Sequence, residues 1–273
     1  MSPEHLLRDA AAKLNKAGVA DAMRDARRLL NHAAGGSYLQ YDLVPPAIIE
    51  RFQEAIARRA MREPVSHIVG QRSFWKHEFT ITSDVLDPRP ETELLVELAL
   101  AEPFSKVLEL GVGSGCILIS LLAENPKARG IGADICEKAV LVAGENAERI
   151  GVADRIVLPM SDWWEDLGGR YDLIVSNPPY IAAKEMADLS PELGYEPRIA
   201  LTDEGDGLGA YRAIAAGLPN HLNDGGRVLV EIGPTQAVAV CAIFREAGLS
   251  DVHIHRDLDG RDRVISARLP GSL

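Results

Sequence analysis

Alternation between short apolar segments and longer amphipathic segments constrains the fold of this chain more than any other sequence feature. The predicted order is strand 107–110, helix 116–123, strand 128–134, helix 137–150, strand 156–158, strand 171–176, strand 226–232, helix 236–247 and strands 251–256 and 263–267. Strands that alternate with helices at this spacing imply right-handed βαβ crossovers and a parallel sheet. A short turn joins the final two strands, which makes them antiparallel to each other. We therefore predict a Rossmann-like α/β sheet with an antiparallel last strand.

The first 62 residues show a different pattern, with three amphipathic segments that each place apolar side chains on one face. The third of them starts at the dipeptide Pro45-Pro46, a favoured way to begin a helix. Because each helix is too short to be stable alone, the three must pack together as a small bundle. The predicted domains are a helical domain at 1–62, a β-hairpin linker at 63–86 and an α/β domain at 87–273.

The composition of this 273-residue chain narrows the classes of function. The formal net charge is −11, so the expected binding partner is a protein with a basic surface rather than duplex DNA. No run approaches 18 apolar residues and the N-terminus lacks the features of a secretory signal, which favours the cytoplasm over a membrane. The cysteines form no C-x-x-C pair, and His253 and His255 have no third ligand nearby in the sequence. We therefore expect no metal.

A glycine-rich loop follows the first strand of the predicted sheet, at the edge where open α/β sheets bind ligands. It consists of Gly111, Val112, Gly113, Ser114 and Gly115. Glycines let the backbone approach a ligand closely, and the helix that follows offers free N–H groups. The spacing G-x-G-x-G differs from the G-x-G-x-x-G of dinucleotide-binding proteins, and a purely structural turn is an alternative interpretation.

Acidic residues follow the next two predicted strands. Asp134 ends the second strand, 19 residues after Gly115, where a carboxylate can accept hydrogen bonds from both hydroxyls of a ribose. Its alternative role is to cap the helix that follows. After the third strand, Asp162 can bond an adenine amino group while Trp163 packs against the ring. Together with the glycine loop, these residues predict a nucleoside-binding site.

The fourth strand runs directly into Asn177-Pro178-Pro179-Tyr180. Prolines have a fixed φ angle and no N–H group, so the carbonyl of Pro178 stays free to accept a hydrogen bond from an NH2 group. The side-chain oxygen of Asn177 can accept a second bond, and Tyr180 can cover the flat face of the bound group. These acceptors predict that a planar amide or amine nitrogen reacts here, with its developing positive charge stabilised by both oxygens.

At these residues the sequence resembles the release-factor glutamine methyltransferase family, and the similarity covers nearly the whole chain. Asn-Pro-Pro-Tyr is shared with adenine-N6 methyltransferases of DNA, whereas VLDPRPETELLV at 85–96 and the helical N-terminal part are more specific. Other similar blocks lie at 64–70, 107–115, 177–181, 196–201, 206–208, 211–212, 231–233 with Gln236, and 260–263. The resemblance implies a class I S-adenosylmethionine-dependent methyltransferase fold.

The resemblance also implies a reaction, N5-methylation of the glutamine in the Gly-Gly-Gln motif of class 1 peptide chain release factors. S-adenosyl-L-methionine would be the cofactor and S-adenosyl-L-homocysteine its product. By motif, the cofactor would be contacted by residues 111–115, Asp134, Trp163 and Asn177, in addition to Asp162, which was assigned to the adenine above. Residues 177–180 would hold the glutamine. The helical domain would recognise the partner.

The sequence departs from the family pattern at two positions. Val112 stands where the family often has Thr, and Asp87 stands where an aliphatic residue usually precedes Pro88. Asp87 lies close in sequence to Arg89 and Glu91, which therefore receive no role, because a helix-capping and ion-pair cluster explains them equally well.

Three other functions stay open. The first is methylation of a glutamine in a ribosomal protein, which would use the same active-site chemistry. The second is adenine-N6 methylation of nucleic acid, which requires base flipping and usually basic, stacking surfaces, and the net charge disfavours it. The third is a nucleoside-binding module without catalysis, which an intact Asn177-Pro178-Pro179-Tyr180 argues against.

Overall fold

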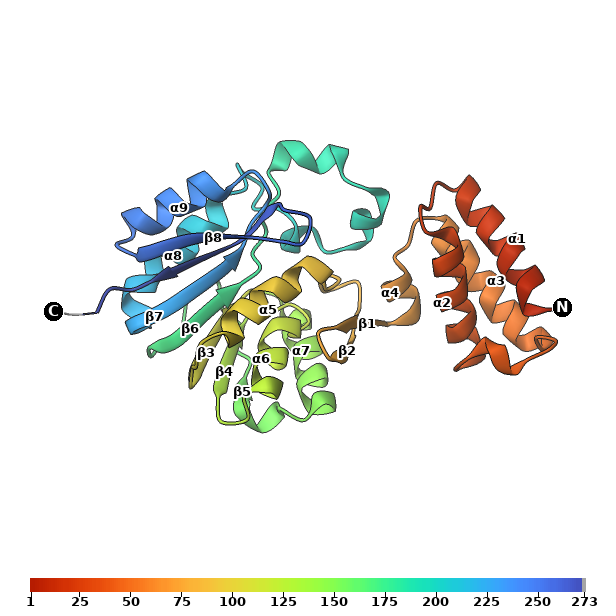
Figure 1. Ribbon diagram of the computed structural model, residues 1–273, viewed down its shortest axis with the longest axis horizontal. Helices are drawn as coiled ribbons and strands as arrows, with labels where there is room; N and C mark the ends of the chain where they lie inside the picture. The colour runs from red at the N-terminus through yellow and green to blue at the C-terminus, as the bar shows by residue number, and fades with distance from the viewer. Residues whose placement is uncertain (272–273) are drawn as a thin grey trace. The chain divides into compact units, whose positions relative to one another are not determined.

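The computed structural model describes residues 1–271, and the chain folds into two compact units (Figure 1). The smaller unit comprises Met1–Gln71 together with a short returning segment, Ser190–Tyr195. The larger unit contains Arg72–Leu189 and the described chain from Glu196 onward. The helical unit thus ends at Gln71 rather than at residue 62, because a fourth helix belongs to it.

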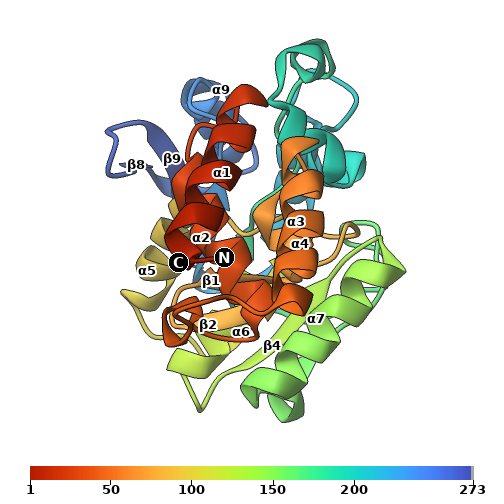
Figure 2. The ribbon, with the colours of Figure 1, turned by 90° about the vertical axis from the view of Figure 1, so that its right-hand side faces the viewer.

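The smaller unit is built from α1 (Pro3–Lys16), α2 (Ala22–Ala34), α3 (Pro46–Ala60), the short α4 (Val65–Val69) and the 3-10 helix η1 (Tyr38–Gln40). Its three long helices lie side by side, as Figure 2 shows. Each turns an apolar face toward a common core, whose most deeply buried members include Leu14, Leu29, Leu30 and Phe52. Mutual packing supplies the stability that helices of this length lack in isolation.

Ion pairs attach the returning segment to the helical unit. Arg59 on α3 is only 7% exposed, and its guanidinium donates to Asp25 at 2.8 Å and to Glu192 at 3.0 Å. Arg62 donates two further hydrogen bonds to Glu192, each 2.7 Å long. Bidentate arginine–carboxylate pairs are among the stronger polar contacts in proteins. Ser190–Tyr195 therefore packs as part of the helical unit, although it is distant from it in the sequence.

The predicted hairpin is present but occupies a narrower range than 63–86, because α4 takes up the beginning of that range. Its strands are β1 (Gln71–Phe74) and β2 (His77–Thr80). Phe74 and Phe79 pack edge to face with ring centroids 6.1 Å apart, and both are buried in the core of the larger unit. Their burial attaches the hairpin to that unit.

The larger unit contains a seven-stranded sheet with the order β5-β4-β3-β6-β7-β9-β8. The strands are β3 (Lys106–Leu110), β4 (Arg129–Ala133), β5 (Ile156–Val157), β6 (Tyr171–Ser176), β7 (Leu222–Glu231), β8 (Ser250–Arg256) and β9 (Asp262–Arg268). Among the strands of the described chain in this sheet, β9 alone runs opposite to the others and is antiparallel to both β7 and β8. The predicted Rossmann-like sheet with an antiparallel last strand is confirmed.

Each face of the sheet has its own apolar core, because successive residues of a strand point to opposite faces. Val107 and Leu173 belong to one core, whereas their neighbours Leu108 and Ile174 belong to the other. Figure 1 shows α5, α6 and α7 on one face, and α8 and α9 on the other. These helices are α5 (Glu93–Leu100), α6 (Cys116–Glu124), α7 (Glu137–Ile150), α8 (Gly209–His221) and α9 (Ala237–Glu246).

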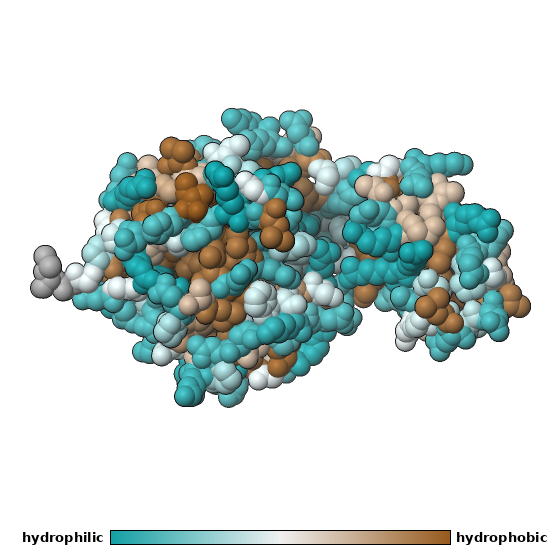
Figure 3. Space-filling model, viewed as in Figure 1, coloured by the Kyte–Doolittle hydropathy of each residue, from teal (hydrophilic) through white to brown (hydrophobic). Residues whose placement is uncertain are grey.

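Most of the visible surface in Figure 3 is polar, as expected when the apolar side chains are buried in these cores. Figure 3 shows hydrophilic residues over most of the visible face of each unit, with hydrophobic residues gathered near the middle of the larger one. Within residues 1–271, no helix combines the length and the apolar character needed to cross a membrane.

Helix α8 was not predicted from the sequence. It contains Gly217 and Pro219, two poor helix formers that hide its periodicity. Tertiary packing stabilises it, because the Trp164 ring occupies the space over Gly217, where a Cβ atom would lie 2.2 Å from Cε2. The Trp164 indole N–H also donates to the carbonyl of Ala213 at 2.8 Å. The sequence likewise did not predict the short 3-10 helices η2 (Pro90–Thr92), η3 (Ala153–Arg155), η4 (Ala183–Asp188), η5 (Pro191–Tyr195) and η6 (Arg198–Ala200).

Candidate active site

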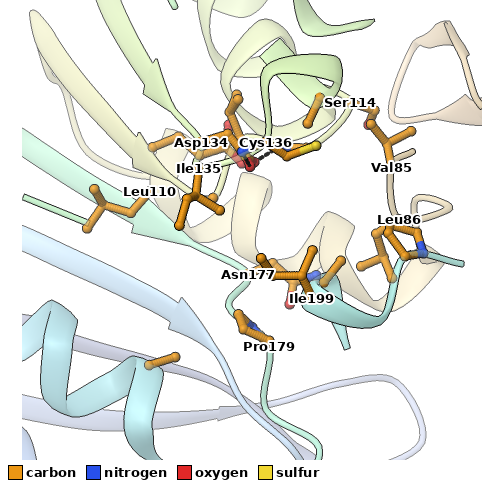
Figure 4. Close-up of a pocket in the computed structure, with 18 of the residues that line it drawn as sticks. Val85, Leu86, Leu110, Ser114, Asp134, Ile135, Cys136, Asn177, Pro179 and Ile199 are labelled. Atoms are coloured by element: carbon orange, nitrogen blue, oxygen red, sulfur yellow. Dashed lines mark hydrogen bonds between the residues drawn. The ribbon is translucent and has the colours of Figure 1, made fainter. Parts of the chain in front are cut away.

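A cavity of about 560 Å³ opens where the carboxyl ends of β3, β4 and β6 meet at one edge of the sheet (Figure 4). Its volume falls within the range of roughly 300–1,000 Å³ that is typical of small-molecule sites. The predicted site residues that line it are Gly111, Val112, Gly113, Ser114, Asp134, Asp162, Trp163, Asn177 and Pro179. Three other predicted residues, Gly115, Pro178 and Tyr180, lie next to lining residues without lining the cavity themselves.

The glycine loop leads from β3 into α6 and forms one wall of the cavity. Gly113 has a φ of +53°, and a Cβ atom there would meet no other atom within 4 Å, so this stretch of backbone is open to a ligand. Gly115 has a φ of +79°, and its Cβ would lie 2.6 Å from Ile119 Cδ1. The loop is held from behind by Asn146 of α7, whose side-chain NH2 group donates to the Ser114 carbonyl at 2.9 Å.

Asp134 follows β4 and serves the protein backbone as well as the cavity. Its carboxylate accepts hydrogen bonds from the N–H groups of Gly113 and Cys136, each at 2.9 Å. Cys136, not Asp134, is the N-cap residue of α7. Burial raises the pKa of Asp134, while backbone hydrogen bonds act in the opposite direction. Since a carboxylate has about four acceptor positions, Asp134 retains capacity for the hydroxyls of a ribose.

Asp162 and Trp163 belong to the chain segment that follows β5, and both line the cavity. The Ser161 N–H donates to the Asp134 carbonyl at 2.9 Å and so ties this segment to the end of β4. Trp163 adopts a φ of +51°, an unusual value for a bulky residue. It lines the cavity, whereas the adjacent Trp164 packs against α8 and stacks on His221 with ring centroids 4.5 Å apart.

Asn177 lies directly after β6, with its side chain at the cavity (Figure 4). The hydroxyl of the preceding Ser176 donates to the Leu110 carbonyl at 2.7 Å, so the ends of β6 and β3 are fixed together. The side-chain Nδ2 of Asn177 donates to the hydroxyl oxygen of Thr92 at 3.4 Å. Pro178 is buried and Pro179 reaches the cavity wall.

Tyr180 is held at both its main chain and its side chain. The Gln236 NH2 group donates to the carbonyls of Tyr180 and Gly207, each at 2.9 Å. Gly207 approaches so closely that a Cβ atom would lie 2.5 Å from the Tyr180 oxygen. The Tyr180 hydroxyl donates to Glu231 at 3.4 Å, and burial raises the pKa of this phenol.

Two buried acids were not assigned to the site from the sequence. Glu109 in β3 lines the cavity and accepts a hydrogen bond from the Leu118 N–H at 2.9 Å, and burial raises its pKa well above the usual value. Glu231 ends β7, is 1% exposed and accepts a 2.6 Å hydrogen bond from the Thr92 hydroxyl. Burial raises the pKa of Glu231 to about 7. The sequence could have indicated Glu231 as a site residue, because it is a charged residue at the carboxyl end of an apolar strand.

Arg89 belongs to an ion-pair cluster at the rim of the cavity. Its guanidinium donates to Glu196 at 2.5 Å and lies 3.9 Å from the Asp87 carboxylate. Burial raises the pKa of Glu196 in spite of this pairing. Burial also acts to lower the pKa of Arg89, but the carboxylates of Glu196 and Asp87 together outweigh it, and the pKa of Arg89 is raised. Glu91, by contrast, is exposed and does not line the cavity.

The strand order, with a ligand-sized cavity at the carboxyl ends of β3, β4 and β6, is that of the class I methyltransferase fold. A crystal structure of a methyltransferase from Pyrococcus furiosus shares the fold with a TM-score of 0.55 and 16% identity, covering 70% of this chain and 88% of that one. A family described as "Methyltransferase small domain" matches residues 74–207. Another, described as "PrmC N-terminal domain", matches residues 5–70.

Curated relatives identify the family within this class. The release factor glutamine methyltransferase of Cereibacter sphaeroides is 54% identical, covering 97% of this chain and 98% of its own length. The protein of the same name from Rhodospirillum rubrum is 43% identical, covering 96% of this chain and 84% of its own length. The chain belongs to the release factor glutamine methyltransferase family and is an S-adenosylmethionine-dependent methyltransferase. The resemblance seen in the sequence is confirmed.

Proposed function

We propose that this enzyme transfers a methyl group from S-adenosylmethionine to the N5 nitrogen of a glutamine side chain in the Gly-Gly-Gln motif of class 1 peptide chain release factors. The names of its relatives support a release factor as the substrate. The observation that carries the proposal is the position of Asn177, whose Nδ2 is engaged by Thr92 beside the cavity. Its Oδ1 is thereby left to accept a hydrogen bond from a substrate amide.

The cavity residues fit S-adenosylmethionine. Open backbone at Gly113 allows close contact, the Asp134 carboxylate can accept from the ribose hydroxyls, and Asp162 with Trp163 suits the adenine. The remaining contacts would come from Gly111, Val112, Ser114 and Asn177, while Gly115, which does not line the cavity, lets the loop pack closely on α6. When bound, the cofactor supplies an electrophilic methyl group on a sulfonium.

The acceptor residues address the main chemical difficulty of this reaction. An amide nitrogen is a weak nucleophile because its lone pair is delocalised into the carbonyl. Hydrogen bonds from the amide N–H groups to Asn177 Oδ1 and to the Pro178 carbonyl would stabilise positive charge as it forms on nitrogen. They would also orient the lone pair toward the methyl donor, and Tyr180 would cover the amide plane. No ionised base is required before transfer, since the proton can leave afterwards.

A methyl-transfer assay with separate substrates tests the assignment. The purified chain is incubated with labelled S-adenosylmethionine and, in separate arms, an unmethylated release factor, unmethylated ribosomal proteins and DNA, and the modified residue is mapped by mass spectrometry. We expect a single methylated glutamine in the release factor. Label in ribosomal protein or in DNA, with none in the release factor, would contradict the proposal and identify which alternative holds.

Asn177→Ala should lower kcat by about 100- to 1,000-fold, the effect of deleting one hydrogen-bonding group preorganised for a transition state. Asn220→Ala, at an exposed position of α8 that does not line the cavity, is the matched control and should retain full activity. A thermal unfolding transition like that of the wild type, followed by calorimetry, shows that the Asn177 variant is folded. An Asn177→Ala variant with unchanged turnover would exclude the proposed role.

A further inference from the structure

The buried acid at the end of β7 has no part in the reaction described so far. Glu231 and Thr92 are each 1% exposed, and they form a short polar contact beside Asn177, at 2.6 Å between Oε2 and Oγ1. Thr92 lines the cavity and contacts the Asn177 Nδ2 at 3.4 Å, while the other oxygen of Glu231 accepts from the Tyr180 hydroxyl at 3.4 Å. One carboxylate thus contacts, directly or through Thr92, two residues of Asn177-Pro178-Pro179-Tyr180.

We infer that Glu231 is a positioning residue that, through Thr92, sets which end of the Asn177 side chain faces the substrate. This inference rests on the proposed function, because it concerns the same amide-binding group. An ionised carboxylate has acceptors only, so the single hydroxyl proton of Thr92 is donated to Glu231. The Thr92 oxygen then offers only lone pairs to Asn177.

That polarity decides the orientation of the Asn177 amide. The two ends of an asparagine side chain have the same shape and are distinguished by their hydrogen-bond partners. With only an acceptor at Thr92, Asn177 turns Nδ2 toward it and Oδ1 away from it. A substrate NH2 group requires an acceptor, so the other orientation would present a donor to a donor and repel it.

The same carboxylate fixes Tyr180. Its hydroxyl donates to Glu231 on one side, and Gln236 holds its main-chain carbonyl on the other. The ring proposed to cover the substrate amide therefore has both of its ends anchored. Glu231 is the common partner of the ring and, through Thr92, of the acceptor.

Glu231→Gln and Thr92→Val test the relay, since glutamine brings a donor to Thr92 and valine removes the hydroxyl while keeping the shape. Each should lower kcat for the release factor by about 10- to 100-fold, with the dissociation constant of S-adenosylmethionine changed less than about threefold. Thr92→Ser keeps the hydroxyl and should restore most of the activity. Glu97→Gln, an exposed carboxyl on α5, is the matched control.

A double variant separates a relay from two independent structural effects. If Thr92 acts only as the link between Glu231 and Asn177, Thr92→Val combined with Glu231→Gln should be no slower than the slower single variant. Multiplied losses, or losses that accompany equally weakened cofactor binding, would overturn the inference, as would an unchanged kcat in Thr92→Val. Because wild-type turnover of the release factor is measured alongside, failure of the proposed function shows as an inactive wild type and is distinguished from failure of the relay.

The pH profile gives a readout that a purely structural role would not move. Protonated Glu231 can donate to Thr92, which frees the Thr92 proton to face Asn177 and reverses the relay. Wild-type kcat should therefore fall as the pH drops below about 7, while the kcat of Glu231→Gln stays flat across the same range. A wild type and a variant with the same profile would contradict the relay. The groups that face Glu231 and influence its charge are Thr92, Tyr180, Arg263, Glu91, Tyr211 and Cys116.

Discussion

The Asp134 carboxylate accepts hydrogen bonds from the protein backbone and is also proposed to accept them from the ribose. Two of its acceptor positions hold the N–H groups of Gly113 and Cys136. Asp134→Ala should therefore weaken S-adenosylmethionine binding by about 10- to 100-fold, equivalent to roughly 1.4–3 kcal/mol from lost charge-assisted hydrogen bonds. Isothermal titration calorimetry measures the change. Asp154→Ala, at an exposed carboxylate beyond α7, serves as the control, and an unchanged affinity in Asp134→Ala would exclude ribose recognition.

Glu231 links stability to pH. Its pKa is raised from 4.5 to about 7 by burial, so the folded protein keeps a proton that the unfolded chain releases. Between pH 4.5 and 7 the folded state binds more protons, and stability from this group falls as the pH rises through that window. Glu231→Gln has no such proton. The Tm of Glu231→Gln minus the wild-type Tm should therefore increase as the pH is raised from 5 to 8, as measured by calorimetry. For Glu97→Gln, the difference from the wild-type Tm should stay constant over the same range.

The sequence predicted those site residues that follow strands in short, contiguous motifs. Residues 111–114 of the glycine loop, Asp134, Asp162, Trp163 and Asn177 all line one cavity, because the ends of parallel strands meet at one edge of the sheet. Thr92 and Glu231 escaped prediction because they are 139 residues apart and only the fold brings them together. The sequence thus predicted which short motifs gather at the cavity, their chemical roles stay predictions, and the pairing of distant residues was not predicted.

At the scale of elements, the strands and most helices followed from periodicity. The prediction for 137–150 agrees with α7, and that for 171–176 agrees with β6. Helix α8 was missed because its stability comes from Trp164 packing on Gly217, a contact with no signature in local sequence. The 3-10 helices after Tyr180 were missed for a related reason, since such short turns have no apolar period.

Ser190–Tyr195 is held to the helical unit by the Glu192 carboxylate and by the Tyr195 hydroxyl, which donates to the Met61 carbonyl at 2.8 Å. Glu192 is held by Arg59 and Arg62, so Glu192→Ala should raise the amide hydrogen-exchange rates of this segment by about 10- to 100-fold. Exchange followed by mass spectrometry measures the rates. Glu185→Ala, exposed in η4, should leave them unchanged. Equal rates in Glu192→Ala and the wild type would show that other contacts order the segment.

At the scale of the whole molecule, the cavity lies entirely within the larger unit and is of a size suited to a cofactor and a side chain. The helical unit, matched by its own family, is proposed to recognise the partner protein. An isolated Gly-Gly-Gln peptide should therefore show a kcat/KM at least about 100-fold below that of the intact release factor, because the peptide lacks the contacts proposed between the release factor and the helical unit. Steady-state kinetics with both substrates measures the ratio, and equal values would argue against recognition outside the cavity.

The central claim is that two oxygen acceptors hold a neutral carboxamide while its nitrogen faces the methyl donor. A crystal structure with S-adenosylhomocysteine and the unmethylated release factor tests it most directly. We expect the glutamine amide nitrogen to lie about 2.7–3.2 Å from both Asn177 Oδ1 and the Pro178 carbonyl oxygen. A glutamine bound elsewhere, or an Asn177 side chain that presents Nδ2 to the substrate while Oδ1 faces Thr92, would contradict it.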